Sequence, residues 1–453
     1  MSSRALVLFT RDLRVNDNPA LADAAAAHGA LLPLFVFDQR LLAGPAGAPG
    51  RVRFLLDSLE DLAAALRERG APLVVRRGDP ARVALALAGE HAVDAIYVSD
   101  DYSPWARRRL GALEDGARQA GIAVHRRPGV TVLPPGAVVP AGGEHYRVFT
   151  PYFRAWSEVP LRDLRPAPER IAPLAGVEPG ELPAAIEIAA GSPPPQCARG
   201  GERVASSLLE AWAAGPVADY GAGHDELAHE GTSRLSAHLH FGTLSPVQAA
   251  RAVGRGAGPE SFVRQLCWRD FYHQLLAAEP RIVSEDYHSR GDDWSTDSDA
   301  LAAWSEGLTG YPIVDAGMRQ LAREGYMHNR ARLIVGSFLT KHMYIDWREG
   351  AAHFARLLTD ADVACNTGNW QWIAGTGTDT RPNRILNPLR QAKQLDPHGD
   401  YVRRHVPELA EIPGALIHTP WKLPTTARPR SYPKPLVELD GALTRLRERR
   451  GAP

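Results

Sequence analysis

The first 127 residues alternate short apolar runs with amphipathic segments, and no other feature of the chain limits its fold as strongly. The apolar runs predict strands, and the segments between them repeat apolar residues at the helical period. Such alternation indicates a parallel, doubly wound α/β sheet, a Rossmann-like arrangement with helices on both faces. The predicted strands are 5–9, 31–37, 72–75, 95–98 and 122–125, and the clearest helices are Val52 to Arg69 and Trp105 to Ala120.

Doubly wound sheets bind ligands beyond the carboxyl ends of their strands, where the strand order reverses. The first predicted strand continues into FTRDLRVNDNP, which has no GxGxxG pattern, so we do not expect a dinucleotide held by a glycine-rich turn. Asp38, Arg51, Asp100 and Asp101 lie at or after predicted strand ends. From the residues alone they are either ligand contacts or ordinary loop and capping residues.

A proline-rich stretch separates this region from the rest of the chain. Nine prolines fall between Glu158 and Ala198. Proline lacks a backbone donor and is excluded from helix interiors, so we expect a long connector draped over the surface. The sequence therefore predicts an α/β domain at 1–128, a connector at 129–201 and an all-helical domain at 202–453.

The helical half carries eight of the ten tryptophans. Helical periodicity is clear in FVRQLCWRDFYHQLLAA and in MHNRARLIVGSFLTKHM. Aromatic residues gathered in one helical domain indicate either a large core or surfaces on which a flat ligand or bases stack.

The densest stretch of this half is LTDADVACNTGNWQW, from Leu358 to Trp372. Trp370 and Trp372 project about 200° apart if the stretch is helical, so they face different surroundings. One indole would then face a buried planar ligand and the other an accessible pocket; the alternative is a packed core with capping residues. The polar residues that accompany them are Asp360, Asp362, Asn366, Asn369 and Gln371.

Two further motifs admit both a functional and a structural interpretation. GTSRLSAHLHFGTLSP, from Gly231 to Pro246, offers hydroxyls and free amides before a helical segment, which suits either a phosphate site or a plain helix cap. LCWRDFYHQ places Trp268 and Phe271 on one helical face beside Arg269, either as a stacking surface or as a core helix with a surface arginine.

MHNRARL adds Asn329, Arg330 and Arg332. Both arginines are suited to a carboxylate or a phosphate, and residues two apart face differently, so we expect one toward the interior and one toward the surface. The pair Asp360 and Asp362 lacks a neighbouring carboxylate cluster, so we do not expect a metal.

Composition narrows the class of protein. The net charge is zero, so any polyanion site must arise from local clustering. The three cysteines form no CxxC pair, which argues against a disulfide framework or a zinc site. Neither a secretory signal nor a long apolar run is present, so we expect a soluble, cytoplasmic protein without membrane contact.

Several motifs together resemble the DNA photolyase and cryptochrome family, most closely members that split cyclobutane pyrimidine dimers. They occur in the same order and at similar spacing along essentially the whole chain: FTRDLRVNDNPAL, VFTPYFRAW, GTSRLS, LCWRDFY, TGYPIVDAGMRQL, MHNR, IDWREG and NTGNWQWIAGTGTD. The resemblance implies that the helical domain binds FAD and that the substrate is UV-damaged DNA. It implies a light-driven lyase that acts as a monomer.

The resemblance also assigns roles to individual residues. Asp362 would hydrogen-bond the polar edge of the flavin, Asn366 would face flavin N5, and Arg332 would pair with Asp360 beside the ring. The other residues implied at FAD are Tyr220, Thr232, Ser233, Arg234, Leu235, Ser236, Phe262, Gln265 and Arg269.

The remaining roles concern electrons, the lesion and DNA. Trp370, Trp347 and Trp294 would relay electrons in that order from flavin to surface. Reduced FAD would pass an electron to a flipped-out dimer, which splits and returns it. The residues implied at the lesion are Gln265, Trp268, Asn329 and Trp372, and those at DNA phosphates are Arg330 and Arg384.

Three positions depart from the family pattern. Gln265 replaces the glutamate usual at the lesion, which removes a charge and a proton donor. Gln at this position also occurs in (6-4) photolyases, but those have a histidine where this chain has Asn329. Phe262 replaces a tryptophan near the flavin. Pro104 stands where a folate-binding glutamate is expected.

The antenna and the competing function follow from the same resemblance. Asp38, Arg51 and Asp101 resemble residues of members that bind 8-hydroxy-5-deazaflavin, so we expect that antenna rather than methenyltetrahydrofolate. The alternative function is a cryptochrome-like photoreceptor that signals without repair. We expect repair, because the lesion residues are kept and only about thirty residues follow Trp421.

Overall fold

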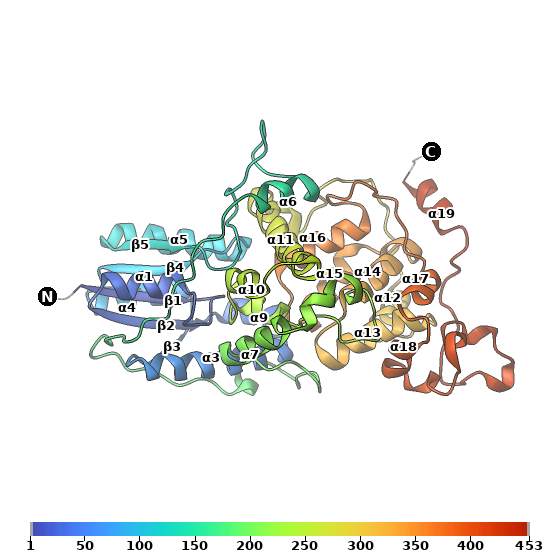
Figure 1. Ribbon diagram of the computed structural model, residues 1–453, viewed down its shortest axis with the longest axis horizontal. Coiled ribbons are helices and arrows are strands. Elements are labelled where there is room, and N and C mark those ends of the chain that lie inside the picture. The colour runs from blue at the N-terminus through green and yellow to red at the C-terminus, as the bar shows by residue number, and fades with distance from the viewer. Residues whose placement is uncertain (1–2, 451–453) are drawn as a thin grey trace.

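The computed structural model of the chain describes residues 3–450 (Figure 1). Five parallel strands form one sheet in the order β3-β2-β1-β4-β5. All five predicted strands are confirmed, with ends shifted by one or two residues. Their bounds are β1 Arg4–Phe9, β2 Ala30–Phe37, β3 Val74–Arg77, β4 Ala95–Ser99 and β5 Ala123–Arg127.

Helices cover both faces of the sheet, as a doubly wound fold requires. Along β1, Val7 and Phe9 pack with α1 (Pro19–Ala27) and α3 (Pro49–Glu68). Leu6 and Leu8 point the other way, toward α4 (Pro80–Glu90) and α5 (Pro104–Ala120). Alternate residues of a strand face opposite sides, so the near-continuous apolar runs produce two cores.

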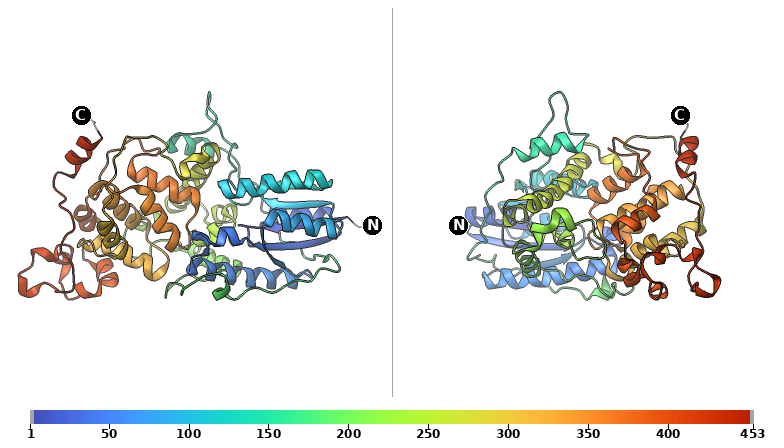
Figure 2. Two further views of the ribbon diagram at one scale, coloured as in Figure 1. Left: turned by 180° about the vertical axis from the view of Figure 1, so that it is seen from behind. Right: turned by 45° about the vertical axis from the view of Figure 1, so that its right-hand side comes forward.

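The carboxyl edge of the sheet meets the helical domain, which lies beside it in all three views (Figures 1 and 2). Strand order reverses between β1 and β4, and the residues after β1 contact α9 (Ser236–Phe241) and Gly242. Leu13 N donates to Phe241 O at 3.3 Å. Gly242 has φ +69°, and a Cβ there would lie 1.9 Å from Arg11 O, so only glycine allows this approach.

The connector is partly buried, so the prediction that all of it is draped over the surface is wrong. Helix α6 (Phe149–Ser157) buries Phe149, Tyr152 and Trp156 in the core of the helical domain, because these residues share one helical face. The proline-rich part after it does run along the α/β domain, where Val75 N donates to Pro179 O at 2.7 Å.

The helical domain begins at α7, and its longest helix is α11, which lies beside α6 and α16 in the part of the domain nearer the sheet (Figure 1). A π-helical turn, Phe338–His342, follows α14. No helix among residues 3–450 is long and apolar enough to cross a membrane. The helices not yet given are α2 Gln39–Leu42, α7 Glu202–Ala213, α8 Tyr220–Gly223, α10 Pro246–Ala252, α11 Ala257–Ala278, α12 Ser298–Glu306, α13 Pro312–Glu324, α14 Asn329–Ser337, α15 Trp347–Leu357, α16 Val363–Ala374, α17 Pro388–Leu395, α18 Asp400–His405 and α19 Ala442–Arg449.

Candidate functional site

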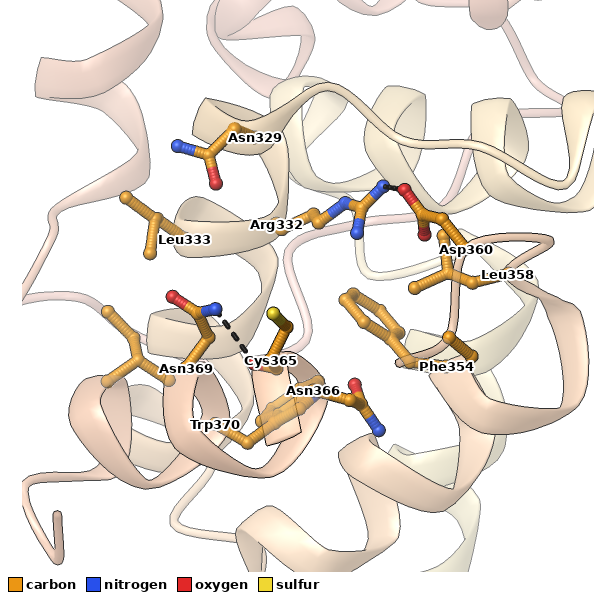
Figure 3. Close-up of a pocket in the computed structure, with 12 residues that line it drawn as sticks. Asn329, Arg332, Leu333, Phe354, Leu358, Asp360, Cys365, Asn366, Asn369 and Trp370 are labelled. Atoms are coloured by element: carbon orange, nitrogen blue, oxygen red, sulfur yellow. Dashed lines mark hydrogen bonds and ion pairs between the residues drawn. The ribbon is translucent and has the colours of Figure 1, made fainter. Parts of the chain in front are cut away.

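A cavity of about 500 Å³ opens in the helical domain, among α8, α9, α11, α14 and α16. Its volume lies within the range of cofactor pockets. Nearly all the residues predicted at FAD line it: Tyr220, Thr232, Ser233, Arg234, Leu235, Ser236, Phe262, Gln265, Arg269, Arg332, Asp360 and Asp362. A smaller cavity of about 70 Å³ adjoins it and shares Arg332 and Asp360; Asn366 lines this one (Figure 3).

One end of the large cavity is suited to phosphate. Helix α9 begins after Leu235 without a side-chain cap, which favours the phosphate-site interpretation of GTSRLS over the plain cap. Thr232 Oγ1 lies 3.3 Å from the hydroxyl of Tyr326, and Arg234 occupies an unusual φ of +54°. Arg234 Nη1 donates to Glu324 Oε2 at 2.7 Å, which orients the arginine side chain.

The predicted pair of Arg332 and Asp360 is confirmed at 2.8 Å, and its two side chains meet above the smaller cavity (Figure 3). Burial raises the pKa of Asp360, but Arg332 more than offsets this and the pKa is lowered. The second oxygen of Asp360, Oδ1, is buried without a partner among the described residues. A buried acceptor of this kind is suited to a donor on a bound cofactor.

Asp362 stands at the centre of a charge cluster drawn from both domains. It caps α16, its Oδ1 accepting from Cys365 N at 3.0 Å. Its Oδ2 pairs with Arg11 of the α/β domain and lies 3.3 Å from His273 Nε2. Burial raises the pKa of Asp362, but His273 and Arg11 hold it well below its ordinary value. The carboxylate is therefore ionised and able to accept a hydrogen bond from a ligand.

Asn366 and Trp370 lie one turn apart on α16 beside the smaller cavity (Figure 3). Asn366 Nδ2 donates to Ala351 O at 3.0 Å, which fixes the amide in orientation. Trp370 is 3% exposed and packs edge-on against Phe354, with ring centroids 5.0 Å apart. A neutral, oriented amide and an indole thus face the same space.

The predicted relay tryptophans lie on three neighbouring segments: Trp370 is on α16, Trp347 begins α15, and Trp294 precedes α12. A Cβ on Gly350 would lie 2.2 Å from Trp370 Cη2, so the indole rests directly on α15. Trp347 is one helical turn before Gly350, on the same face of that helix. The parallel bridge from Ser295 to Ile345 brings the segment of Trp294 beside the start of α15. Trp370 and Trp347 are both buried, and Trp294 is half-buried.

The aromatic wall of the large cavity has support from the connector. Trp268 stacks on Phe149 with ring centroids 3.6 Å apart and planes 5° from parallel. Phe271 is fully buried, so LCWRDFYHQ provides both a stacking surface and a core face. Trp372 lines the cavity with Asn329 and Gln265, and Arg384 lies over its indole at 5.1 Å. Arg384 does not line the cavity itself.

Both arginines of MHNRARL bind carboxylates, and both are half-buried, so the expected division into one interior and one surface arginine is wrong. Arg330 is half-buried and pairs with Asp225 through two bonds of 2.5 and 2.6 Å. That pairing places it at the cavity margin, already neutralised. Arg269 was expected on the surface in one interpretation of its helix, and this is wrong: it is 9% exposed and donates to Leu239 O and Val130 O.

The residues predicted at the antenna lie at the carboxyl edge of the sheet. Asp38 caps α2 and accepts from Trp105 Nε1 at 3.2 Å. Asp101 pairs with Arg11 at 3.3 Å, and burial and Arg11 act on its pKa in opposite directions with a net lowering. Arg51 donates to Pro45 O and, across the domain boundary, to Ala355 O.

Sequence reasoning did not assign roles to several residues of the site. Arg11 belongs to FTRDLR, and nothing local in the sequence relates it to Asp362, which is 351 residues away. Its place directly after β1, at the reversal of strand order, is the signal that marks it as a crevice residue. Phe149 and His273 were likewise visible only as members of motifs.

The chain is similar to known proteins along nearly its whole length. Residues 5–172 match the family described as DNA photolyase, and residues 262–452 match the FAD binding domain of DNA photolyase. The chain is 49% identical to a deoxyribodipyrimidine photo-lyase of Streptomyces griseus over 99% of both chains.

Solved structures show the same fold over nearly the whole chain. A bacterial class III photolyase from Agrobacterium tumefaciens has a TM-score of 0.93 at 32% identity and covers 100% of this chain and 98% of its own. An archaeal photolyase from Sulfolobus tokodaii with two FAD molecules has a TM-score of 0.87 at 32% identity, over 98% and 99%. The chain belongs to the DNA photolyase family.

Proposed function

We propose that this protein uses light to split cyclobutane pyrimidine dimers in UV-damaged DNA. The observation that carries the proposal is a single cavity whose inner part is polar and charged and whose mouth has aromatic walls. The inner part has the residues that a flavin needs, and the mouth has the indoles and the amide that a flipped-out pair of bases needs.

The inner residues fit FAD. The uncapped start of α9, with Thr232 and Ser233, would bind the phosphates, and Asp362 and Arg332 would hold the polar edge of the ring. The free oxygen of Asp360 and the oriented amide of Asn366 add neutral or anionic contacts. When bound and reduced, FAD supplies the electron that opens the cyclobutane ring after light is absorbed.

The mouth would hold the lesion. Phe149 stacks on one face of Trp268 and would leave the other face for a base. Trp372 would provide the opposite apolar surface. Exposed Asn329 and Gln265 would hydrogen-bond base carbonyls. Because a dimer stacks poorly in the duplex, extruding it into this cavity costs less than extruding a normal base.

We propose that Arg384 makes the main contact to the DNA backbone. It is exposed and lies over Trp372, so it can reach a phosphate beside the flipped lesion. Arg330 is already bound by Asp225, and we propose that it contributes mainly by shaping the cavity margin. We propose that the protein acts as a monomer.

Electrons would reach the flavin through Trp294, Trp347 and Trp370. The packing of Trp370 on Gly350, one turn from Trp347, supports the inner step, and the Ser295–Ile345 bridge supports the outer one. This relay would restore the reduced cofactor but take no part in repair itself.

For the antenna we propose 8-hydroxy-5-deazaflavin at the carboxyl edge of the sheet, with methenyltetrahydrofolate as the alternative. Asp38 and Asp101 are buried there beside the half-buried Arg109, whose pKa burial lowers despite these carboxylates. The archaeal photolyase from Sulfolobus tokodaii holds a second FAD, so a flavin-like antenna is a third candidate to distinguish. Absorbance of the chromophore released from protein made in its own host decides among them.

The direct test is repair. Purified, chemically reduced protein is illuminated with dimer-containing DNA, and restored thymines are measured with a dark sample as the control. Light-dependent restoration is expected. A protein fully loaded with FAD that restores no thymines in light contradicts the proposal.

The relay has a separate test. Trp370→Phe should abolish photoreduction of oxidised FAD while chemically reduced protein still repairs, because the relay only supplies electrons. Loss of repair in a folded, FAD-loaded Trp370→Phe protein contradicts the assignment.

A further inference from the structure

Lys341 is a buried lysine whose amine bonds two carbonyl groups from different parts of the chain. It is 3% exposed, whereas the other three lysines of the chain are exposed. Its Nζ donates to Ala374 O at 2.6 Å and to Pro382 O at 2.8 Å. These carbonyls belong to the two ends of the segment that joins α16 to α17, so a single amine bonds both ends.

That segment, the 375–384 loop with the sequence GTGTDTRPNR, is narrow at its base. Gly375 has φ +78°, and a Cβ there would lie 2.1 Å from Pro382 O, so only glycine allows the two ends to come this close. Arg450 Nη2 also donates to Ala374 O, at 2.8 Å. The base of the loop is therefore held both by close backbone approach and by bonds from buried cations.

The two bonds of Lys341 lie next to residues proposed at the lesion and at DNA. Trp372 is two residues before Ala374, and Arg384 is two residues after Pro382. The guanidinium carbon of Arg384 lies 5.1 Å from the ring centroid of Trp372. The amine thus bonds the backbone close to both members of this pair. If the bonds were lost, the ends of the loop could separate and Arg384 could move away from the indole.

The helix that carries Lys341 also holds the chain on the far side of Arg384. Lys341 belongs to the π-helical turn that follows α14, and such turns are rare and frequent at functional sites. Ser337, the last residue of α14, accepts through Oγ from Leu386 N at 3.0 Å. Arg384 therefore lies between Pro382 and Leu386, two points that are bonded to one continuous piece of helix.

The surroundings of Lys341 disfavour its charged form. Burial lowers the pKa of Lys341 to about 7, and the guanidinium groups of Arg450 and Arg290 act in the same direction. The carboxylates of Asp292 and Asp379 act in the opposite direction. Nζ has a donor for each of the two carbonyls whether or not it carries its third proton, so both bonds can form on either side of neutral pH.

We propose that Lys341 is a positioning residue for DNA binding: it joins the two ends of the 375–384 loop and so holds Arg384 where it meets a phosphate beside the flipped lesion. Lys341 lines neither of the two cavities described above, so it acts through Arg384. It should therefore affect the binding of dimer-containing DNA and not the light-driven step. The proposal rests on the proposed function and on the role of Arg384 in it.

Binding in the dark, where no repair takes place, tests the proposal. FAD-loaded protein is titrated with a duplex that contains one thymine dimer, and the Kd is measured. Lys341→Met, which keeps the length of the side chain but removes its donors, should weaken binding about tenfold, as should Arg384→Ala. The double variant should bind no more weakly than Arg384→Ala alone, because Lys341 acts through Arg384. Losses that add in the double variant overturn the proposal.

Repair in light separates positioning from general damage to the fold. In Lys341→Met the KM for dimer-containing DNA should rise about tenfold, while kcat under fixed illumination and the FAD content stay at native values. Thr340→Val is the matched control, because it removes a bond of 2.8 Å from Thr340 Oγ1 to Gly336 O in the same turn and no bond to the loop. It should leave KM unchanged. An equal rise of KM in both variants, or a fall of kcat in Lys341→Met, contradicts the proposal.

Hydrogen exchange without DNA distinguishes failure of this proposal from failure of the proposed function. Amides of the 375–384 loop, such as Gly377 N, which donates to Gln371 O, should exchange about tenfold faster in Lys341→Met and at the native rate in Thr340→Val. Unchanged exchange in a folded Lys341→Met protein overturns the proposal, whether or not the native protein repairs DNA. Native protein that binds dimer-containing DNA no more tightly than undamaged DNA contradicts the proposed function instead.

Discussion

The cavity of the helical domain and the carboxyl edge of the α/β sheet were both predicted to bind a chromophore, and they differ in how their charges are used. In the cavity, the buried Oδ1 of Asp360 has no hydrogen-bond partner among the described residues. At the sheet edge, Arg11 joins Asp101 to Asp362, and Arg51 reaches Ala355 O. The edge is therefore a joint between domains as well as a candidate antenna site. Charged residues at the end of a strand do not by themselves distinguish these uses.

Acidification should destabilise the helical domain more than the α/β domain, and we expect this difference to be the largest. Six histidines of the helical domain are buried or half-buried, and burial lowers the pKa of each to about 4, or to about 3 for His405: His238, His240, His328, His342, His353 and His405. Below the ordinary value of 6.5 the unfolded chain binds these protons and the folded one does not. The free energy of unfolding should fall by up to about 1.4 kcal/mol per histidine per pH unit from pH 6.5 to 4.

Hydrogen exchange at pH 7, 6, 5 and 4, followed by mass spectrometry, checks this. Helices α13 to α16 should lose protection before strands β1 and β4. Simultaneous loss in both domains would mean that the joint couples them into one unfolding unit.

Arg11→Ala should give the next largest effect, because it leaves two buried carboxylates, Asp101 and Asp362, without their shared partner. We expect a loss of about 3 to 5 kcal/mol in the free energy of unfolding. The control is Arg40→Ala, whose exposed pair with Asp79 should contribute less than about 1 kcal/mol. Denaturant titration measures both. Equal, small losses would mean that the sheet edge is not a joint.

Gly350→Ala tests the packing beside the cavity. The new Cβ would lie 2.2 Å from Trp370, so the indole must move, at a cost of about 1 to 3 kcal/mol. The control is Gly111→Ala in α5 of the α/β domain, where nothing lies within 4 Å and about 0.5 to 1 kcal/mol should be gained. Thermal unfolding gives the sign, and slower photoreduction in Gly350→Ala alone would connect the packing to the relay.

Gln265→Glu should give the smallest effect. The side chain is exposed at the cavity mouth, so the restored carboxylate should raise dimer affinity or repair yield by about fivefold, or about 1 kcal/mol. Gln39→Glu, on α2 and remote from the cavity, is the control. Binding of dimer-containing DNA and the repair yield per photon are the measurements; values equal to those of the control would mean that the amide serves as well.

Features that depend on the local sequence, such as the strands, could be predicted from it. Strand periodicity located all five strands. The pair of Arg332 and Asp360, 28 residues apart, was implied by the family resemblance and not by a local pattern. Reasoning from local patterns described the connector as surface chain, because its prolines outweighed the apolar face of α6. Arg11 and Phe149 act through tertiary contacts with residues far along the chain, and neither periodicity nor composition predicts such contacts.

The stack of Phe149 under Trp268 bears on where the chain can be divided. Phe149 comes from the connector, yet it takes away the rotational freedom of an indole that belongs to the helical domain. Because Trp268 is already fixed in the folded protein, it loses little further conformational entropy when a base stacks on it. A fragment cut at residue 202 would keep every lesion contact and still bind the lesion more weakly, because its receptor would have to be ordered anew at each encounter.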